Sequence, residues 1–111
     1  MDRLEFFRHT IQAAIRSWAE FLKPDQGMEN ALVFDENTDN YVYIYTGWKN
    51  DRHINATIVH IGIRGGKIHI FHDGIEDSIV NDLLEAGVLE SEIVIERHPP
   101  YARQFTPFAV S

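Results

Sequence analysis

The chain contains no cysteine, and it has fewer basic than acidic residues. The absence of cysteine excludes disulfides, thiolate metal sites, iron–sulfur clusters and cysteine nucleophiles. Ten Lys and Arg stand against 17 Asp and Glu, so the formal net charge is −7 with His neutral. Because affinity for a phosphate backbone comes from clustered Lys and Arg, this balance argues against a protein whose main role is direct nucleic-acid binding.

Long apolar runs are also missing. No run approaches the roughly 20 residues that a membrane-spanning helix needs. The first five residues, Met1–Glu5, carry charges where a signal peptide would place its apolar stretch. We therefore expect no membrane association and take the cytoplasm as the location. The 44% hydrophobic content is nevertheless too high for a disordered chain, and 111 residues fit one domain, residues 1–111.

Helical and strand periods alternate along the chain. The apolar residues of segment 2–22 recur at i, i+3, i+4 and i+7, which predicts a helix that ends before Pro24. Short turns, including Gly65-Gly66, separate the next strands, and links this short require antiparallel neighbours. A second helix, capped by Asp77 or Ser78, precedes the last strand. The expected elements after the first helix are strands 29–35, 40–48, 53–64 and 67–72, a helix near 77–86 and a strand at 93–95.

The C-terminal tail is rich in aromatic residues. Tyr101, Phe105 and Phe108 follow Pro99-Pro100, and a disordered polar tail would not carry three aromatics in this way. We therefore expect the tail to be docked. The predicted fold class is α+β, with an N-terminal helix, an antiparallel sheet of four to five strands, a second helix before the last strand and a docked tail.

Both faces of the predicted sheet are apolar. Tyr41, Tyr43 and Tyr45 alternate onto one face of their strand, and we expect this row to be buried or to face another subunit. One helix cannot cover both faces, so the second face needs the second helix, the tail or another copy of the chain. This pattern favours a homodimer or a higher homo-oligomer. As an alternative, the Tyr row and the scattered basic residues form a small stacking platform for nucleic acid.

Candidate chemistry is sparse. His69 and His72 lie near Asp73, but their odd separation on a strand predicts opposite faces, so we expect no metal site. His60 is predicted to share a face with Ile54, Ala56 and Ile58, where a lone His is more often a hydrogen-bonded core residue than a base. No serine occupies a nucleophile elbow, and no glycine-rich phosphate loop is present, so no cofactor is expected. A hydrolase that uses His60 with Asp51 or Asp73 is the catalytic alternative.

Several short motifs together resemble one family. They are Gly47-Trp48-x-x-Asp51-Arg52, Ile58-Val59-His60-Ile61, Gly66-Lys67-Ile68-x-Ile70, Asp73-Gly74-x-Glu76 and His98-Pro99-Pro100-Tyr101-x-Arg103-Gln104-Phe105-Thr106-x-Phe108-Ala109. This set resembles the XisI family, described as fdxN-element excision controlling factors. In two departures, His69 stands where relatives typically carry Trp, and His72 where they often carry Arg.

The resemblance implies an accessory protein of programmed DNA-element excision that has no enzymatic activity of its own. Such proteins act beside a recombinase and a nuclease-like companion called XisH. The partner-binding candidates are Arg52, His98, Pro99, Pro100, Tyr101, Arg103, Phe105 and Phe108, and the polar motif residues are Asp51, His60 and Asp73. The tail residues are equally compatible with internal docking onto the sheet. The functional alternatives are a direct DNA-binding accessory factor and a small hydrolase.

Overall fold

The computed structural model describes residues 2–111. Every predicted helix and strand is present, with bounds that agree to within two residues. The tail adds a short third helix after Pro99, and a 3-10 turn precedes the last strand. The elements are α1 Arg3–Phe21, β1 Met28–Asp35, β2 Asn40–Lys49, β3 Arg52–Arg64, β4 Lys67–Asp73, α2 Ile79–Glu85, η1 Glu90–Glu92, β5 Ile93–Ile95 and α3 Pro100–Arg103.

The five strands form one sheet in the order β1-β2-β3-β4-β5. The first four strands pair antiparallel, as their short links require. The fifth strand pairs parallel with β4, so that Ile68 lies opposite Ile93. The expectation of a wholly antiparallel sheet therefore does not hold for β5, and the sheet is mixed. The segment 74–92 carries α2 and is long enough for a crossover, which brings β5 alongside β4 in the same direction.

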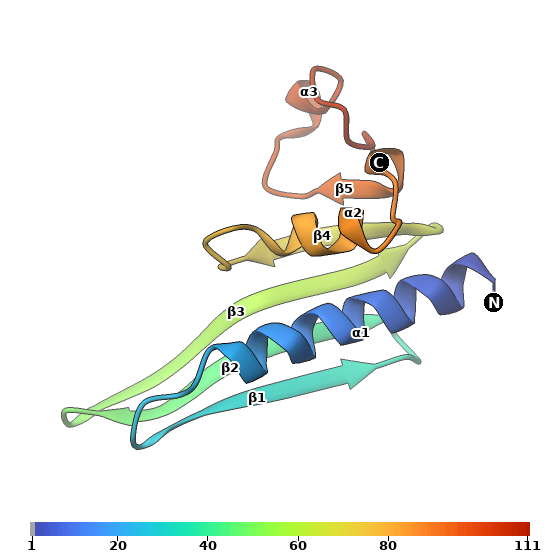
Figure 1. Ribbon diagram of the computed structural model, residues 1–111. Helices are drawn as coiled ribbons and strands as arrows, with labels where there is room; N and C mark the ends of the chain where they lie inside the picture. Colours follow the sequence, from blue (N-terminus) through green and yellow to red (C-terminus); the bar gives the residue numbers. More distant parts are fainter. Residues whose placement is uncertain (1) are drawn as a thin grey trace.

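Both longer helices cover the same face of the sheet (Figure 1). From α1, Phe7, Ile11 and Ile15 are buried, and they join one apolar cluster with Leu83 of α2. The indole Nε1 of Trp18 donates a 2.6 Å hydrogen bond to the carboxylate of Asp82, which ties the two helices together. The second helix is therefore not available to cover the opposite face, where Val33 is 51% exposed and Trp48 is 60% exposed.

The tyrosine row of β2 lies in this core, beneath α1. Tyr41 and Tyr43 are 0% and 2% exposed. The Tyr41 hydroxyl donates to Asp39 at 2.7 Å, and the Tyr43 hydroxyl donates to Asn30 at 3.0 Å. The expectation that Tyr41 and Tyr43 face another subunit or a nucleic acid is therefore wrong, whereas their predicted burial is correct. Tyr45 is half-buried, and its hydroxyl oxygen accepts from the backbone N–H of Asp25.

Two β-bulges change which side chains share a face. In β3, Tyr43 pairs with Val59 but Ile44 pairs with Thr57, so Ile58 is the extra residue. Residues directly opposite on neighbouring strands lie on the same face, and the extra residue moves the rest of the strand to the other face. His60, opposite Val42, therefore lies on the outer face, away from the helices. The prediction that His60 shares a face with Ile54 and Ala56 is wrong for this reason.

The second bulge is at Phe71 in β4. His72 pairs with His60, and Ile70 pairs with Ile61, so Phe71 is the extra residue. His69 pairs with Gly62, two residues beyond His60. His69 and His72 therefore lie on the same outer face, although their odd separation predicted opposite faces.

No helix within residues 2–111 combines the length and the apolar character needed to cross a membrane.

Candidate functional site

The tail is docked through Arg103. Its guanidinium donates to the carbonyl oxygen of His98 at 2.8 Å, to that of Val110 at 3.2 Å and to the Glu96 carboxylate at 3.2 Å. The side chain is only 12% exposed. The backbone N–H of Ala109 also donates to the carbonyl oxygen of Ile93 in β5 at 2.8 Å. These bonds close the tail into a loop against the sheet edge, which confirms the predicted docking.

Glu96 connects this loop to the sheet. Its carboxylate accepts from the Nδ1 of His69 at 2.7 Å as well as from Arg103. The hydrogen bond from His69, with the nearby charge of Arg103, holds the pKa of Glu96 below its ordinary value. Glu96 was not among the residues singled out from the sequence, because an exposed Glu after a short strand is ordinary. Its role depends on a contact between segments far apart in the chain.

The aromatic residues of the tail divide into two kinds. Phe108 is half-buried and packs against the core cluster. Tyr101 and Phe105 are 76% and 82% exposed. Both flank Arg103, so two large aromatic side chains project from a segment whose backbone is fixed. Pro99 precedes α3, and Pro100 is its first residue, so their fixed backbone angles begin this short helix.

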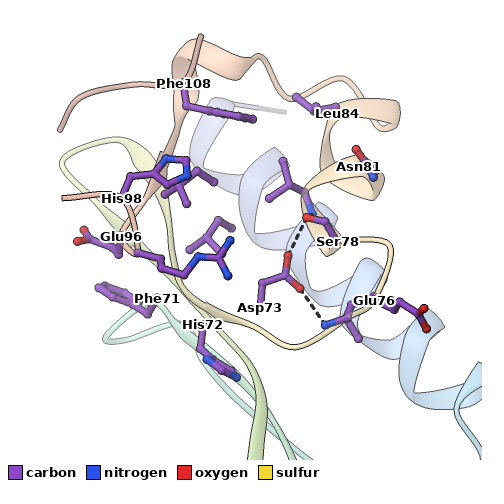
Figure 2. A pocket seen from close by; sticks show the side chains of 15 residues that line it. Phe71, His72, Asp73, Glu76, Ser78, Asn81, Leu84, Glu96, His98 and Phe108 are labelled. Atoms are coloured by element: carbon purple, nitrogen blue, oxygen red, sulfur yellow. Dashed lines mark hydrogen bonds between the residues drawn. The ribbon is translucent and has the colours of Figure 1, made fainter. Parts of the chain in front are cut away.

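A cavity of about 620 Å³ lies between the end of β4, the start of α2 and the tail (Figure 2). Phe108 and Leu84 lie at one end, and His72 and Glu76 at the other. Two segments that carry the sequence motifs, 71–76 and 97–98, therefore meet here although they are far apart in the chain.

Asp73 is committed to structure at the wall of this cavity. Its carboxylate accepts from the backbone N–H groups of Ile75 and Ile79, both at 3.1 Å, and from the Ser78 hydroxyl at 2.8 Å. Ser78 in turn accepts from the backbone N–H of Val80 and caps α2. The predicted cap at Ser78 is confirmed, and Asp73 supports it from the preceding strand.

The residues of the hydrolase alternative do not come together. His60 shares a hydrogen bond of 3.1 Å with the side-chain oxygen of Asn40 on the outer face. Asp73 pairs with Val59, whose side chain lies in the core on the other face of the sheet. Asp51 is exposed in the turn between β2 and β3, next to Arg52 at the start of β3. Neither the Asp51 nor the Asp73 carboxylate therefore lies where it could orient the ring of His60.

His98 lines the cavity, and one of its two ring nitrogens is buried. Within residues 2–111, its Nδ1 is buried and has no hydrogen-bond partner. His98 also holds the tail through its backbone oxygen, so the residue belongs to the docking of the tail as well as to the cavity.

The outer face carries an aromatic group that the sequence did not reveal. The rings of His60 and Phe71 are 4.8 Å apart between centroids, and those of His69 and Phe71 are 6.0 Å apart and stacked. The guanidinium of Arg64 lies 5.6 Å from the centre of the Phe71 ring. Burial, followed by the charges of Arg64 and His72, lowers the pKa of His60. No metal-holding group of three or more His, Asp or Glu occurs in residues 2–111.

Comparison with known proteins identifies the family. No curated protein matches the chain. A XisI-like protein from Anabaena variabilis is 25% identical, with a TM-score of 0.92 over 97% of this chain and 99% of that chain. The fdxN element excision controlling factor XisI from the same organism is 31% identical, with a TM-score of 0.87 over 99% of this chain and all of the other. The family model for XisI protein matches residues 1–110. The chain belongs to the XisI family.

Proposed function

We propose that this chain, acting as a single non-catalytic domain, controls excision of a DNA element by binding a protein of the excision machinery. A similar protein, 31% identical over nearly the whole chain, is described as an fdxN element excision controlling factor. The candidate catalytic residues support a binding role, because Asp73 holds the start of α2 and His60 pairs with an amide. The proposed partner is the nuclease-like companion XisH.

The observation that carries this proposal is the exposure of Tyr101 and Phe105 on a fixed backbone. Exposed aromatics cost free energy in a free domain, and they are the residue type that contributes most at protein interfaces. Because Arg103 already fixes the tail, little conformational entropy is lost when a partner covers these rings. Pro99 and Pro100, also exposed, extend the same surface.

In this proposal some residues of the tail dock it onto the domain, and others bind the partner. Arg103, His98 and Phe108 attach it to the domain, and Tyr101 and Phe105 are the proposed contact residues. Arg52 lies at the start of β3, separate from the tail in the chain, and is not part of the proposed surface. The association of several copies stays a prediction. Tyr41 and Tyr43 are buried within the domain and cannot form the interface between copies.

Co-purification with XisH tests the proposal. We expect the double variant Tyr101→Ala/Phe105→Ala to lose the companion while its melting temperature stays unchanged, because both rings are exposed. Phe21→Ala is the matched control, since Phe21 is 73% exposed on α1, and it should retain the companion. Retention of XisH by the double variant would overturn the proposed partner surface. Capture of a recombinase in place of XisH would overturn the proposed partner.

A further inference from the structure

The three central strands, β2 to β4, differ in charge from the rest of the chain. Segment 40–73 carries four Lys and Arg and four His against two carboxylates, Asp51 and Asp73. Its formal charge is therefore +2, whereas the remaining residues, with six Lys and Arg and 15 Asp and Glu, carry −9. The acidic balance of the whole chain thus conceals a basic central sheet.

The strand pairing directs two permanent cations of this segment outward. Arg64 and Lys67 are paired across the β3–β4 hairpin, on the same face as His60 and His69. Arg64 donates only to backbone carbonyl oxygens and to the side-chain oxygen of Asn40. The charge of Arg64 helps to lower the pKa of the nearby Asp39 carboxylate, but that carboxylate is bonded to Arg8. The carboxylates of this face belong to the edge strand β1, where alternation places Glu29 and Asp35, and to Glu96, which is paired with Arg103.

Aromatic rings occupy both ends of the same face. At one end, Trp48 is 60% exposed and lies 5.1 Å from the ring of His53. At the other end, Phe71 stacks with His69 and lies against the tilted ring of His60. From His53 to His60 the strand rises by roughly 23 Å, at about 3.3 Å per residue. The two ring groups are therefore separated by the length of several nucleotides, with exposed Thr57 between them.

We propose that the outer face of β2–β4 binds single-stranded DNA. Bases stack on Trp48 and on Phe71, and the phosphates lie near Arg64 and Lys67. A cationic face with spaced aromatic rings is the usual chemistry of single-strand recognition, because every base has a stacking surface and the backbone is charged. A duplex hides its bases from such rings. The choice of DNA over RNA rests on the proposed role in excision.

A second copy of the chain suits this face less well. In a symmetric dimer the same patch meets itself, so Arg64 and Lys67 of one protomer would lie near the same cations of its partner. The charge of the face is complementary to a polyanion and not to itself. The occupant that this face fits is therefore the nucleic acid.

Fluorescence anisotropy of a labelled thymidine strand of about 12 nucleotides, titrated with the full chain, tests the proposal. We expect binding at low salt that weakens by about 25-fold for a tenfold rise in salt, as two phosphate contacts predict. Trp48→Ala should weaken binding by about tenfold, which corresponds to the loss of one stacked base. Lys67→Glu should weaken it by at least fivefold.

Two matched controls separate this face from general effects. Arg16→Glu makes the same change in charge on α1, on the other side of the sheet, and Phe21→Ala removes a ring there that is at least as exposed as Trp48. Both should bind within about twofold of the unaltered chain. No binding at low salt, equal weakening by Arg16→Glu, or equally strong competition by duplex DNA would overturn the proposal. Tighter binding of a uridine strand would reassign the face to RNA.

The two proposals fail separately. The variant Tyr101→Ala/Phe105→Ala should keep the DNA strand and lose the protein companion, whereas Trp48→Ala should show the reverse. If the mass in solution is that of a dimer and Trp48→Ala converts it to the 12.8 kDa monomer, the face is an interface between copies and the DNA proposal is wrong.

Discussion

At the scale of single residues, Arg103 determines the position of the tail. Its guanidinium joins backbone oxygens on both sides of α3 to Glu96 and, through Glu96, to His69 on β4. Lys would not reproduce this arrangement, because an ammonium lacks the planar set of donors that reaches three acceptors at once. The position therefore requires Arg for geometric reasons.

Arg103→Ala should destabilise the chain by about 2 kcal/mol. The hydrogen bonds of the charged guanidinium are lost, and Glu96 loses one of its two side-chain partners. Urea unfolding measures the loss, and limited proteolysis should release the last residues earlier than in the unaltered chain. Arg97→Ala is the control, because Arg97 is an exposed neighbour, and it should be close to neutral. Equal stability of the two variants would show that the contacts of Arg103 do not hold the tail.

Asp39 gives the stability of the chain a dependence on acid. The guanidinium of Arg8, bonded at 2.8 Å, is the main cause that holds the pKa of Asp39 below its ordinary value, and the Tyr41 hydroxyl adds to it. A lowered pKa in the folded state means that this carboxylate adds stability above the pKa of the unfolded chain, about 3.9. That contribution is lost as the pH falls through the folded pKa.

We therefore expect the urea midpoint to change little from neutral pH to about pH 5 and to fall below about pH 4. In Asp39→Asn the midpoint at neutral pH should be lower and the acid fall shallower. Some fall should persist, because Glu92 and Glu96 also have lowered pKa values. Parallel curves for the two proteins would contradict this assignment to Asp39.

At the scale of elements, the start of α2 depends on a residue from the preceding strand. Asp73 satisfies two backbone N–H groups and orients the cap residue Ser78. Ser78 itself has a positive φ of 65°, a conformation that is uncommon for a residue other than glycine. The network around Asp73 therefore keeps a strained turn in place.

Asp73→Ala should cost about 1–2 kcal/mol, since the N–H groups it satisfies lose their partner at the helix start. Thermal unfolding followed by circular dichroism measures the change. Asp77→Ala is the matched control, because Asp77 is exposed, lies four residues further along, and is not the residue whose side chain caps α2. If both variants melt at the same temperature, the proposed support of α2 by Asp73 is wrong.

The elements were predictable from local patterns, and the faces of the strands were not. Helical spacing and short turns depend on neighbouring residues, so α1 and the four antiparallel strands agree with prediction. The bulges at Ile58 and Phe71 arise from pairing across strands, and nothing local marks either residue. Each bulge reverses the alternation beyond it. For this reason His60 was misplaced, and the ring group around Phe71 was not foreseen.

The tail shows the same division between local and distant information. Its docking was predictable from three aromatics after two prolines. The distinction between exposed Phe105 and half-buried Phe108 was not, because it depends on where Arg103 finds its acceptors. The parallel pairing of β5 was likewise missed, since the path of a crossover is decided by the packing of α2 and not by the strand itself.

At the scale of the whole molecule, the cations of the sheet and the exposed rings of the tail lie on different surfaces. Both longer helices cover one face of the sheet, and the tail lies beyond β5 (Figure 1). The central strands carry Arg64 and Lys67 on the other face, and the tail carries the exposed rings of Tyr101 and Phe105. A net charge of −7 is therefore compatible with a local cationic face. A protein built in this way has room for a protein partner at the tail and for a DNA strand on the sheet at the same time.

The affinity for XisH, measured by isothermal titration calorimetry, tests the central claim of partner binding through the tail most directly. For Tyr101→Ala/Phe105→Ala we expect a rise in Kd of at least about 100-fold, from two contact residues of about 1.4 kcal/mol or more each, with an unchanged melting temperature. Phe21→Ala should bind like the unaltered chain. An unchanged Kd for the double variant would show that XisH does not bind through Tyr101 and Phe105.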